Sequence, residues 1–419
     1  MKTDAERIAE AVDPEALIEL VQQATRIPSV TPNERDFAGW VHAELNSSQV
    51  FGRSEMVDCE ADRPNVYGSA GGGTGRSLVL AGHLDTVDVD DWVEHWKGTD
   101  RADPFGAHIV DGEIWGRGVT DQKAGICASI EALRAFERLG LRPQGRVSTL
   151  FVCDEESGQP NSGVSAGMRA AVEGNYVDPS TDFAIYTEPT TSAIYSAQMG
   201  FLIADITYEG VSAYFGRPEL GVDALRAGHR LLDRLWLHSE ELRTGEPHEL
   251  LGDAFLLVTS VRSGGNIAVP GLFEMSLIRK ILPRETLDEA AAAIETIARS
   301  TAAAHSVSCQ VVFSAPRDHA VGGTPDEIDR DHPGVKALAR SIKATTGMPA
   351  RIEGAPYWSE KPFLRDLGIP GVYFAAGDIA SCHTPFERLS IDELVSATRT
   401  LAHFIAEWCG VEELKTRTH

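Results

Sequence analysis

The feature of this chain that most limits its fold is a series of short apolar runs that each lead into polar residues. Four runs have the length and composition of buried strands, namely SLVLAG (77–82), VSTLFVC (147–153), FAIYT (183–187) and GVYFAA (371–376). Residues 122–139 lie between the first two runs and carry apolar side chains at helical spacing. The order strand, helix, strand predicts an α/β fold with a mostly parallel sheet flanked by helices.

The pattern changes between residues 200 and 314. Strand-like and helix-like segments follow one another there in the order βαββαβ, which predicts an inserted α+β domain with helices on one face of an antiparallel sheet. A chain of 419 residues also exceeds what one hydrophobic core usually supports. We therefore expect a discontinuous first domain of residues 1–199 and 315–419, and an inserted domain of residues 200–314.

The first forty residues predict two helices. Residues 14–26 have apolar side chains at helical spacing, and Thr31-Pro32-Asn33-Glu34 has the form of a capping box with proline at the first helical position. The second helix is thus expected to begin at this tetrapeptide.

Composition narrows the class of partner. The 62 acidic residues outnumber the 38 basic ones and give a formal net charge of −24, which disfavours nucleic acid and anionic membranes. The six cysteines form no CxxC pair, and the N-terminal segment lacks the apolar core of a signal peptide. No stretch is long and uncharged enough to span a bilayer. We expect a soluble protein of the cytoplasm without nucleic-acid or membrane partners.

Histidines and carboxylates follow the predicted strands and stand at the start of the helix between the first two strands. Ligands in open α/β sheets gather at the carboxyl ends of the strands, so these side chains are expected to meet. Their types suit zinc, manganese or cobalt, and crowded acids are relieved by a cation. Each motif alone is ordinary, but together they predict a metal site. The side chains are His83, Asp121, Glu155, Glu156, Glu188 and His383, with Asp85 placed to orient His83.

Five motifs carry a family resemblance, in the family's order and at its spacings. They are GHLDTV (82–87), GRGVTDQKAG (116–125), DEESG (154–158), TEPT (187–190) and SCHTPFE (381–387). Over nearly its whole length the sequence resembles the co-catalytic metallopeptidase family of acetylornithine deacetylase, succinyl-diaminopimelate desuccinylase, aminoacylase and carboxypeptidase G.

The resemblance implies two divalent metal ions, with zinc expected first and manganese or cobalt as alternatives. It implies that Asp121 bridges them, that one ion is also held by His83 and Glu188, and that the other is held by Glu156 and His383. It further implies that Asp85 orients His83 and that Glu155 is the general base. The inserted segment resembles the family's lid and dimerisation domain, which implies a homodimer.

The inserted segment departs from the family pattern at residues expected to touch the substrate. Tyr214 stands where the family has a histidine that stabilises the oxyanion, and a phenol donates one hydrogen bond without positive charge. Ile267 stands where the family has an asparagine, with Asn266 one position before it, and Lys280 stands where the family has the arginine of its Asp-x-Arg pattern. The candidate substrate and oxyanion contacts are Tyr214, Asn266, Lys280 and Arg217.

The resulting functional hypothesis is a metal-dependent hydrolase of C–N bonds. Its expected substrate is a small N-acyl amino acid or a related carboxylate, cleaved by metal-activated water with Glu155 as general base. One alternative is an aminohydrolase that deaminates an aromatic amino acid such as a nitroanthranilate on the same site. A third hypothesis is a non-catalytic member that serves as a binding or assembly module.

Overall fold

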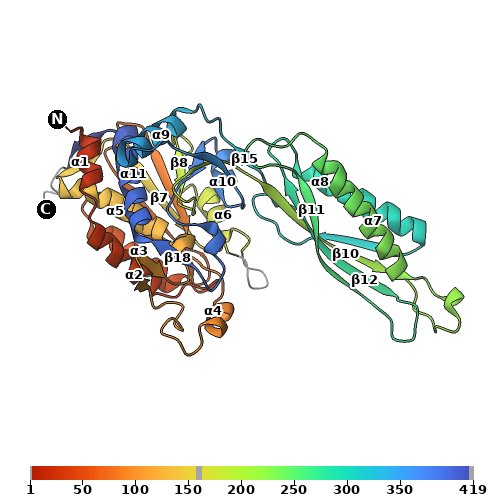
Figure 1. The fold of residues 1–419 in the computed structure, drawn as a ribbon. Helices are drawn as coiled ribbons and strands as arrows, with labels where there is room; N and C mark the ends of the chain where they lie inside the picture. Colours follow the sequence, from red (N-terminus) through yellow and green to blue (C-terminus); the bar gives the residue numbers. More distant parts are fainter. Residues whose placement is uncertain (1, 157–162, 415–419) are drawn as a thin grey trace. The chain divides into compact units, whose positions relative to one another are not determined.

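The structure is a computed structural model that describes residues 2–156 and 163–414 (Figure 1). The chain forms two compact units. Unit 1 comprises Met1–Ser196, Ile328–Glu353 and Phe363–His419, and unit 2 comprises Ala197–Glu327 and Gly354–Pro362. Within the described ranges, no helix is both long enough and apolar enough to cross a bilayer.

A nine-stranded sheet is the centre of unit 1. Its strand order is β1-β2-β7-β3-β8-β17-β9-β15, and β16 pairs with β9 at the side. The four central strands β7, β3, β8 and β17 are parallel to one another, whereas β1, β2, β9 and β15 pair antiparallel with their neighbours. The strands are β1 (Phe51–Glu60), β2 (Arg63–Ala70), β3 (Leu78–His83), β7 (Val147–Val152), β8 (Ala184–Tyr186), β9 (Ile194–Gln198), β15 (Asp326–Glu327), β16 (Ile352–Ala355) and β17 (Gly371–Tyr373). The predicted α/β class with a mostly parallel sheet is confirmed.

Helices pack on both faces of this sheet (Figure 1). The main core joins one sheet face to side chains of α1, α2, α3, α5, α9 and α11, while α6 packs against β1, β2 and β7. The helices are α1 (Asp4–Glu10), α2 (Pro14–Thr25), α3 (Arg35–Ser47), α4 (Asp90–His95), α5 (Ala124–Arg138), α6 (Ala166–Glu173), α9 (Pro333–Thr346), α10 (Lys361–Asp366) and α11 (Ile391–Cys409). Short strands complete the fold: β4 (His108–Val110), β5 (Glu113–Trp115), β6 (Leu141–Pro143), β18 (Arg388–Ser390) and β19 (Val411–Glu413).

The prediction of a helix start at Thr31-Pro32-Asn33-Glu34 is wrong. Helix α3 begins at Arg35, and the side chain of its N-cap residue, Glu34, makes no capping hydrogen bond. The Glu34 carboxylate instead accepts a hydrogen bond from Arg63, and the Thr31 hydroxyl donates to Asp85. The two side chains that would form a local capping box therefore make hydrogen bonds with buried residues elsewhere in the chain.

Unit 2 has the element order β10, α7, β11, β12, α8, β13. Its sheet order is β11-β12-β10-β13, all antiparallel, and α7 and α8 pack side by side over one face (Figure 1). Alternate residues of β12 and β10 are buried beneath these helices in a separate core. The elements are β10 (Gly200–Glu209), α7 (Ala224–Arg243), β11 (Phe255–Ser263), β12 (Leu272–Ile281), α8 (Leu287–His305), β13 (Ser308–Phe313) and β14 (Gly322–Gly323).

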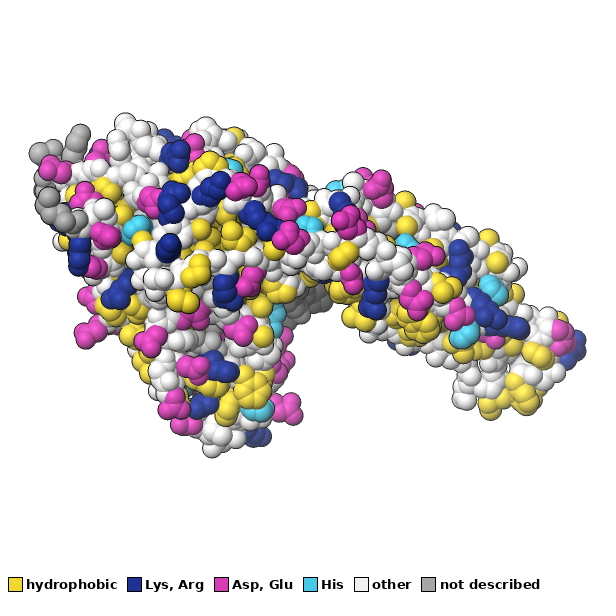
Figure 2. All heavy atoms as spheres, turned by 45° about the horizontal axis from the view of Figure 1, so that its top comes forward, with side chains coloured by type: hydrophobic (Ala, Val, Ile, Leu, Met, Phe, Trp, Pro, Cys, Tyr) yellow, Lys and Arg dark blue, Asp and Glu magenta, His cyan; other side chains and the backbone are white. Residues whose placement is uncertain are grey.

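The surface carries charges of both signs. On the face turned to the viewer in Figure 2, Asp and Glu side chains are interspersed with Lys and Arg over both units. On this face the acidic side chains are therefore not gathered in one patch.

Candidate metal centre

The polar residues predicted as metal ligands converge in unit 1. His83 is the last residue of β3, Glu155 and Glu156 follow β7, and Glu188 follows β8. Asp121 lies in the kinked turn that precedes α5, and His383 lies in the segment between β17 and β18. Parallel strands end at one edge of the sheet, so residues far apart in sequence meet there.

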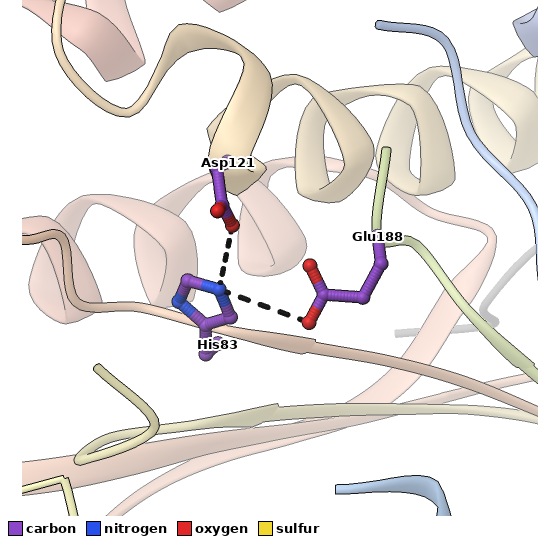
Figure 3. Close-up of side chains that lie close together, drawn as sticks. All are labelled: His83, Asp121 and Glu188. Atoms are coloured by element: carbon purple, nitrogen blue, oxygen red, sulfur yellow. Dashed lines mark hydrogen bonds and ion pairs between the residues drawn. The ribbon is translucent and has the colours of Figure 1, made fainter. Parts of the chain in front are cut away.

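Three buried side chains form the first ligand group (Figure 3). The Nε2 atom of His83 lies 3.0 Å from Oδ1 of Asp121 and 3.9 Å from Oε1 of Glu188. One atom of each residue lies within 4.8 Å of the others, which is a spacing that one cation can bridge. One imidazole and two carboxylates are donors that zinc and its first-row neighbours accept.

A second group uses the other oxygen of Asp121. The Nε2 atom of His383 lies 3.2 Å from Oδ2 of Asp121 and 2.9 Å from Oε1 of Glu156. Asp121 thus presents one carboxylate oxygen to each histidine. This arrangement fits two ions that share one carboxylate. His83, Glu155 and Glu156 also satisfy the same spacing criterion as a third group.

The titratable groups of the site shift one another's pKa values. Burial alone would lower the pKa of His83, but hydrogen bonds to Asp121 and Asp85 raise it well above the usual value. Burial opposes the charge of His383 too, yet Asp121 and Glu156 raise its pKa to about 11. Burial and the charge of Asp121 raise the pKa of Glu156 to about 8. Without a metal ion, protons therefore neutralise this group of acids.

Asp85 connects the two sides of the site. Its backbone carbonyl oxygen lies 2.9 Å from Nδ1 of His83, and its carboxylate lies 3.6 Å from the same atom. The carboxylate accepts hydrogen bonds from the backbone N–H groups of Glu155 (3.2 Å) and Glu156 (2.9 Å). The Thr31 hydroxyl completes the set at 2.8 Å. Sequence reasoning placed Asp85 beside His83 but missed Thr31, because a partner 54 residues away leaves no local pattern.

Glu387 and Arg117 form a second support that sequence reasoning missed. Glu387 is fully buried, and its Oε1 accepts hydrogen bonds from the backbone N–H groups of Thr120 (3.1 Å) and Asp121 (3.3 Å). Its Oε2 accepts from Arg117 at 2.9 Å, and Arg117 also donates to the carbonyl oxygen of Thr384. The pair therefore ties the segment of Asp121 to the segment of His383. Both residues lie inside quoted motifs, which was the only sequence signal for them.

The candidate substrate residues lie in unit 2. They are Tyr214, Arg217, Asn266 and Lys280. The first three are exposed and lie in the loops after β10 and before β12. Lys280 lies at the other end of β12, roughly 26 Å away along the strand, and donates a hydrogen bond to the carbonyl oxygen of Leu251. Unit 2 thus brings three of the four together and keeps Lys280 apart from them.

The roles of all these residues, metal ligands included, stay predictions. Ser157 and Gly158 of the DEESG motif lie outside the described residues.

Comparisons with known proteins identify the family of the chain. Residues 79–407 match Peptidase family M20/M25/M40. The chain is 26% identical to N-formyl-4-amino-5-aminomethyl-2-methylpyrimidine deformylase of Halalkalibacterium halodurans, over 95% of this chain and 96% of that protein. It is 24% identical to succinyl-diaminopimelate desuccinylase of Ehrlichia chaffeensis, over 96% of this chain and 100% of that protein.

A solved structure supports the fold. The YXEP protein of Bacillus subtilis, described as a dinuclear metal binding peptidase, superposes with a TM-score of 0.63 at 15% identity, over 94% of this chain and 97% of that one. The family resemblance seen in the five motifs is confirmed by the family match. The chain therefore belongs to Peptidase family M20/M25/M40 and is a hydrolase that acts on C–N bonds.

Proposed function

We propose that this hydrolase cleaves the amide bond of a small N-acyl amino acid or a related carboxylate, with two divalent metal ions at the candidate centre. The observation that carries the proposal is that the two oxygens of Asp121 face two different histidines, His83 and His383. Bound ions would be held by His83, Asp121 and Glu188 on one side and by Asp121, Glu156 and His383 on the other. Such ions supply charge that acidifies a water molecule and polarises the scissile carbonyl group.

Glu155 is proposed as the general base. It is half-buried next to the ligand Glu156, and Asp85 accepts a hydrogen bond from its backbone N–H. Its carboxylate takes the proton of the attacking water and passes it to the leaving nitrogen. Asp85 fixes the orientation of His83 through Nδ1 and the position of Glu155 through the backbone.

Zinc is the proposed metal, with manganese or cobalt as substitutes. Two imidazoles and three carboxylates would suit all three ions, and zinc is the one expected first.

Removal of an acyl group is favoured over deamination. The names of the deformylase and the desuccinylase among the relatives both describe removal of an acyl group. The three candidate contacts that lie together in unit 2, Tyr214, Arg217 and Asn266, are hydrogen-bond donors, one of them cationic, and suit a substrate carboxylate or an oxyanion. The substrate is therefore proposed to carry a carboxylate.

A homodimer through unit 2 is proposed as the working form. β11 is an edge strand that exposes Leu257 (55%) and Val261 (49%), and the neighbouring α7 exposes Trp236 (51%) and Leu237 (58%). An unpaired strand edge beside exposed apolar side chains favours pairing with a second copy. Sedimentation velocity should give a dimer, and Trp236→Glu should shift it toward monomer, whereas a wild-type monomer contradicts the proposal.

The free state of all six cysteines is consistent with the proposed location in the cytoplasm.

The decisive test replaces Glu155 by Gln. The variant should keep both metal equivalents by elemental analysis and should lose roughly 10²-fold or more in turnover on N-formyl, N-acetyl and N-succinyl amino acids. Glu173→Gln, an exposed site on α6, is the matched control and should behave as wild type. Retained turnover in Glu155→Gln would contradict the assignment of Glu155 as the general base.

The same panel separates the reaction types. Release of carboxylic acid without ammonia supports the acyl-amide proposal, whereas ammonia release from an aromatic amino acid supports the aminohydrolase alternative. A protein that holds no metal and turns over nothing would favour the binding or assembly module.

A further inference from the structure

Two thiols in unit 1 lie in direct contact outside the metal centre. The Sγ atoms of Cys59 and Cys153 are 2.8 Å apart, although 94 residues separate them in sequence. All six cysteines fall within the described ranges, and no other pair of cysteine thiols there makes a hydrogen bond. A disulfide bond has a length of about 2.05 Å, so the two sulfurs need only a small approach to bond.

The strand arrangement explains this contact. β2 lies between β1 and β7 in the sheet, and the pairing of β1 with β2 is interrupted between Asp58 and Glu60, at Cys59. The Cys59 thiol donates to the carbonyl oxygen of Arg63 at 3.1 Å, and the Cys153 thiol lies 3.6 Å from the same oxygen. One carbonyl group of β2 thus holds both sulfurs on one side of the strand.

The two cysteines differ in access and in anchoring. Cys59 is half-buried in a hairpin strand, whereas Cys153 is fully buried. The backbone N–H of Cys153 is fixed by a hydrogen bond to Asn65 at 3.0 Å. Cys59 is therefore the more accessible thiol for a small oxidant, and Cys153 is the buried thiol next to it. The hydrogen bond from the Cys153 thiol also lowers the pKa of Cys59.

We propose that Cys59 and Cys153 form a redox-active dithiol that hydroperoxides oxidise to a disulfide. The Cys59 thiolate attacks one oxygen of hydrogen peroxide, so that an S–O bond forms, the O–O bond breaks and hydroxide leaves to become water. The Cys153 sulfur then attacks the Cys59 sulfur, which forms the S–S bond, breaks the S–O bond and releases a second water. Two thiols lose two electrons, and one peroxide becomes two water molecules.

The bond would join the β1–β2 hairpin to the segment that carries the acidic residues of the metal centre. Cys153 is followed directly by Asp154, whose carboxylate accepts hydrogen bonds from Arg63 and from the backbone N–H groups of Gly163, Val164 and Ala166. Closing a loop of this length constrains the unfolded chain, so the oxidised protein should unfold at a temperature several degrees higher than the reduced one.

The test treats the metal-loaded protein with one to two equivalents of hydrogen peroxide. Intact mass should fall by about 2 Da, peptide mapping should show a Cys59–Cys153 disulfide, and dithiothreitol should restore both thiols. Cys59→Ser should form no disulfide. Cys153→Ser should trap sulfenic acid on Cys59, which dimedone labels. Cys309→Ser is the matched control, since Cys309 is half-buried without a sulfur neighbour in the described chain, and should react as wild type.

Three results would overturn the proposal. They are sulfinic acid on Cys59 of the wild-type protein without any disulfide, a disulfide between other cysteines, or an equal mass loss in Cys59→Ser. Cys59→Ala serves as the second variant if the serine variant does not fold, and near-ultraviolet circular dichroism of each variant shows whether its packing is native.

Discussion

Replacing Glu387 by Gln tests whether the metal centre depends on the buried support behind Asp121. The Glu387 carboxylate accepts three hydrogen bonds, from Arg117 and from the backbone N–H groups of Thr120 and Asp121. An amide has one acceptor oxygen and one NH2 group, so at least one of the three donors would face another donor. The substitution keeps the shape of the side chain and removes its charge.

The expected cost follows from the burial of the pair. Glu387 and Arg117 have side chains that are 1% and 2% exposed, and breaking one partner of such a pair costs about 3–5 kcal/mol. Arg117 keeps its contact with Asp91 at 3.1 Å, so the lower end, about 3 kcal/mol, is expected. That loss corresponds to a Tm decrease of roughly 6 °C for a unit of this size. Displacement of Asp121 should also weaken metal binding by about 10- to 100-fold.

The assay compares thermal unfolding of the metal-free proteins and metal affinity by competition with a chelator. The matched control is Glu113→Gln, because the ion pair of Glu113 with Arg388 at 3.1 Å is 35% and 39% exposed. An ion pair at such a site contributes about 0–1 kcal/mol, so its Tm should hardly move. If Glu387→Gln lost no more stability than the control and bound metal as wild type, the positioning role of Glu387 would be refuted.

Three further outcomes are expected. Metal binding at pH 7 should release at least one proton, because the pKa of His383 is raised to about 11 and the ion displaces the proton from its ring. Metal affinity should therefore fall as the pH falls. An indicator titration that shows no proton release would contradict this prediction. Thr31→Val should lower the free energy of unfolding by about 2 kcal/mol through the lost bond to Asp85, and Thr31→Ser should recover most of it in urea titrations. Gly125→Ala should destabilise the folded protein by about 1–3 kcal/mol, since the added methyl group would lie 2.4 Å from a backbone oxygen. Gly39→Ala, with open space around the added methyl group, should stabilise the protein. Equal effects of the two substitutions in calorimetry would refute the packing argument.

The sequence by itself determined the central parallel strands, helix α5 and the side-chain types of the candidate site. Apolar runs of strand length and a helical period survive in any tertiary context that buries them, so β3, β7, β8, β17 and α5 could be predicted. The polar side chains behind those strands could be named because the ends of parallel strands meet at one edge of a sheet. The chemical types of the side chains then limited the site to a cation.

Only the tertiary structure decided which groups support that site. Thr31 and Glu34 have the local form of a capping box, yet their partners lie 54 and 29 residues away. Glu387 reaches back 270 residues to Arg117, and Cys59 contacts Cys153 across an intervening strand. Such contacts depend on strand order and register, which no local periodicity encodes. An unpaired polar group in the interior costs more free energy than a lost helix cap at the surface. The buried hydrogen bonds of Thr31 and Glu34 therefore form in place of the local capping box.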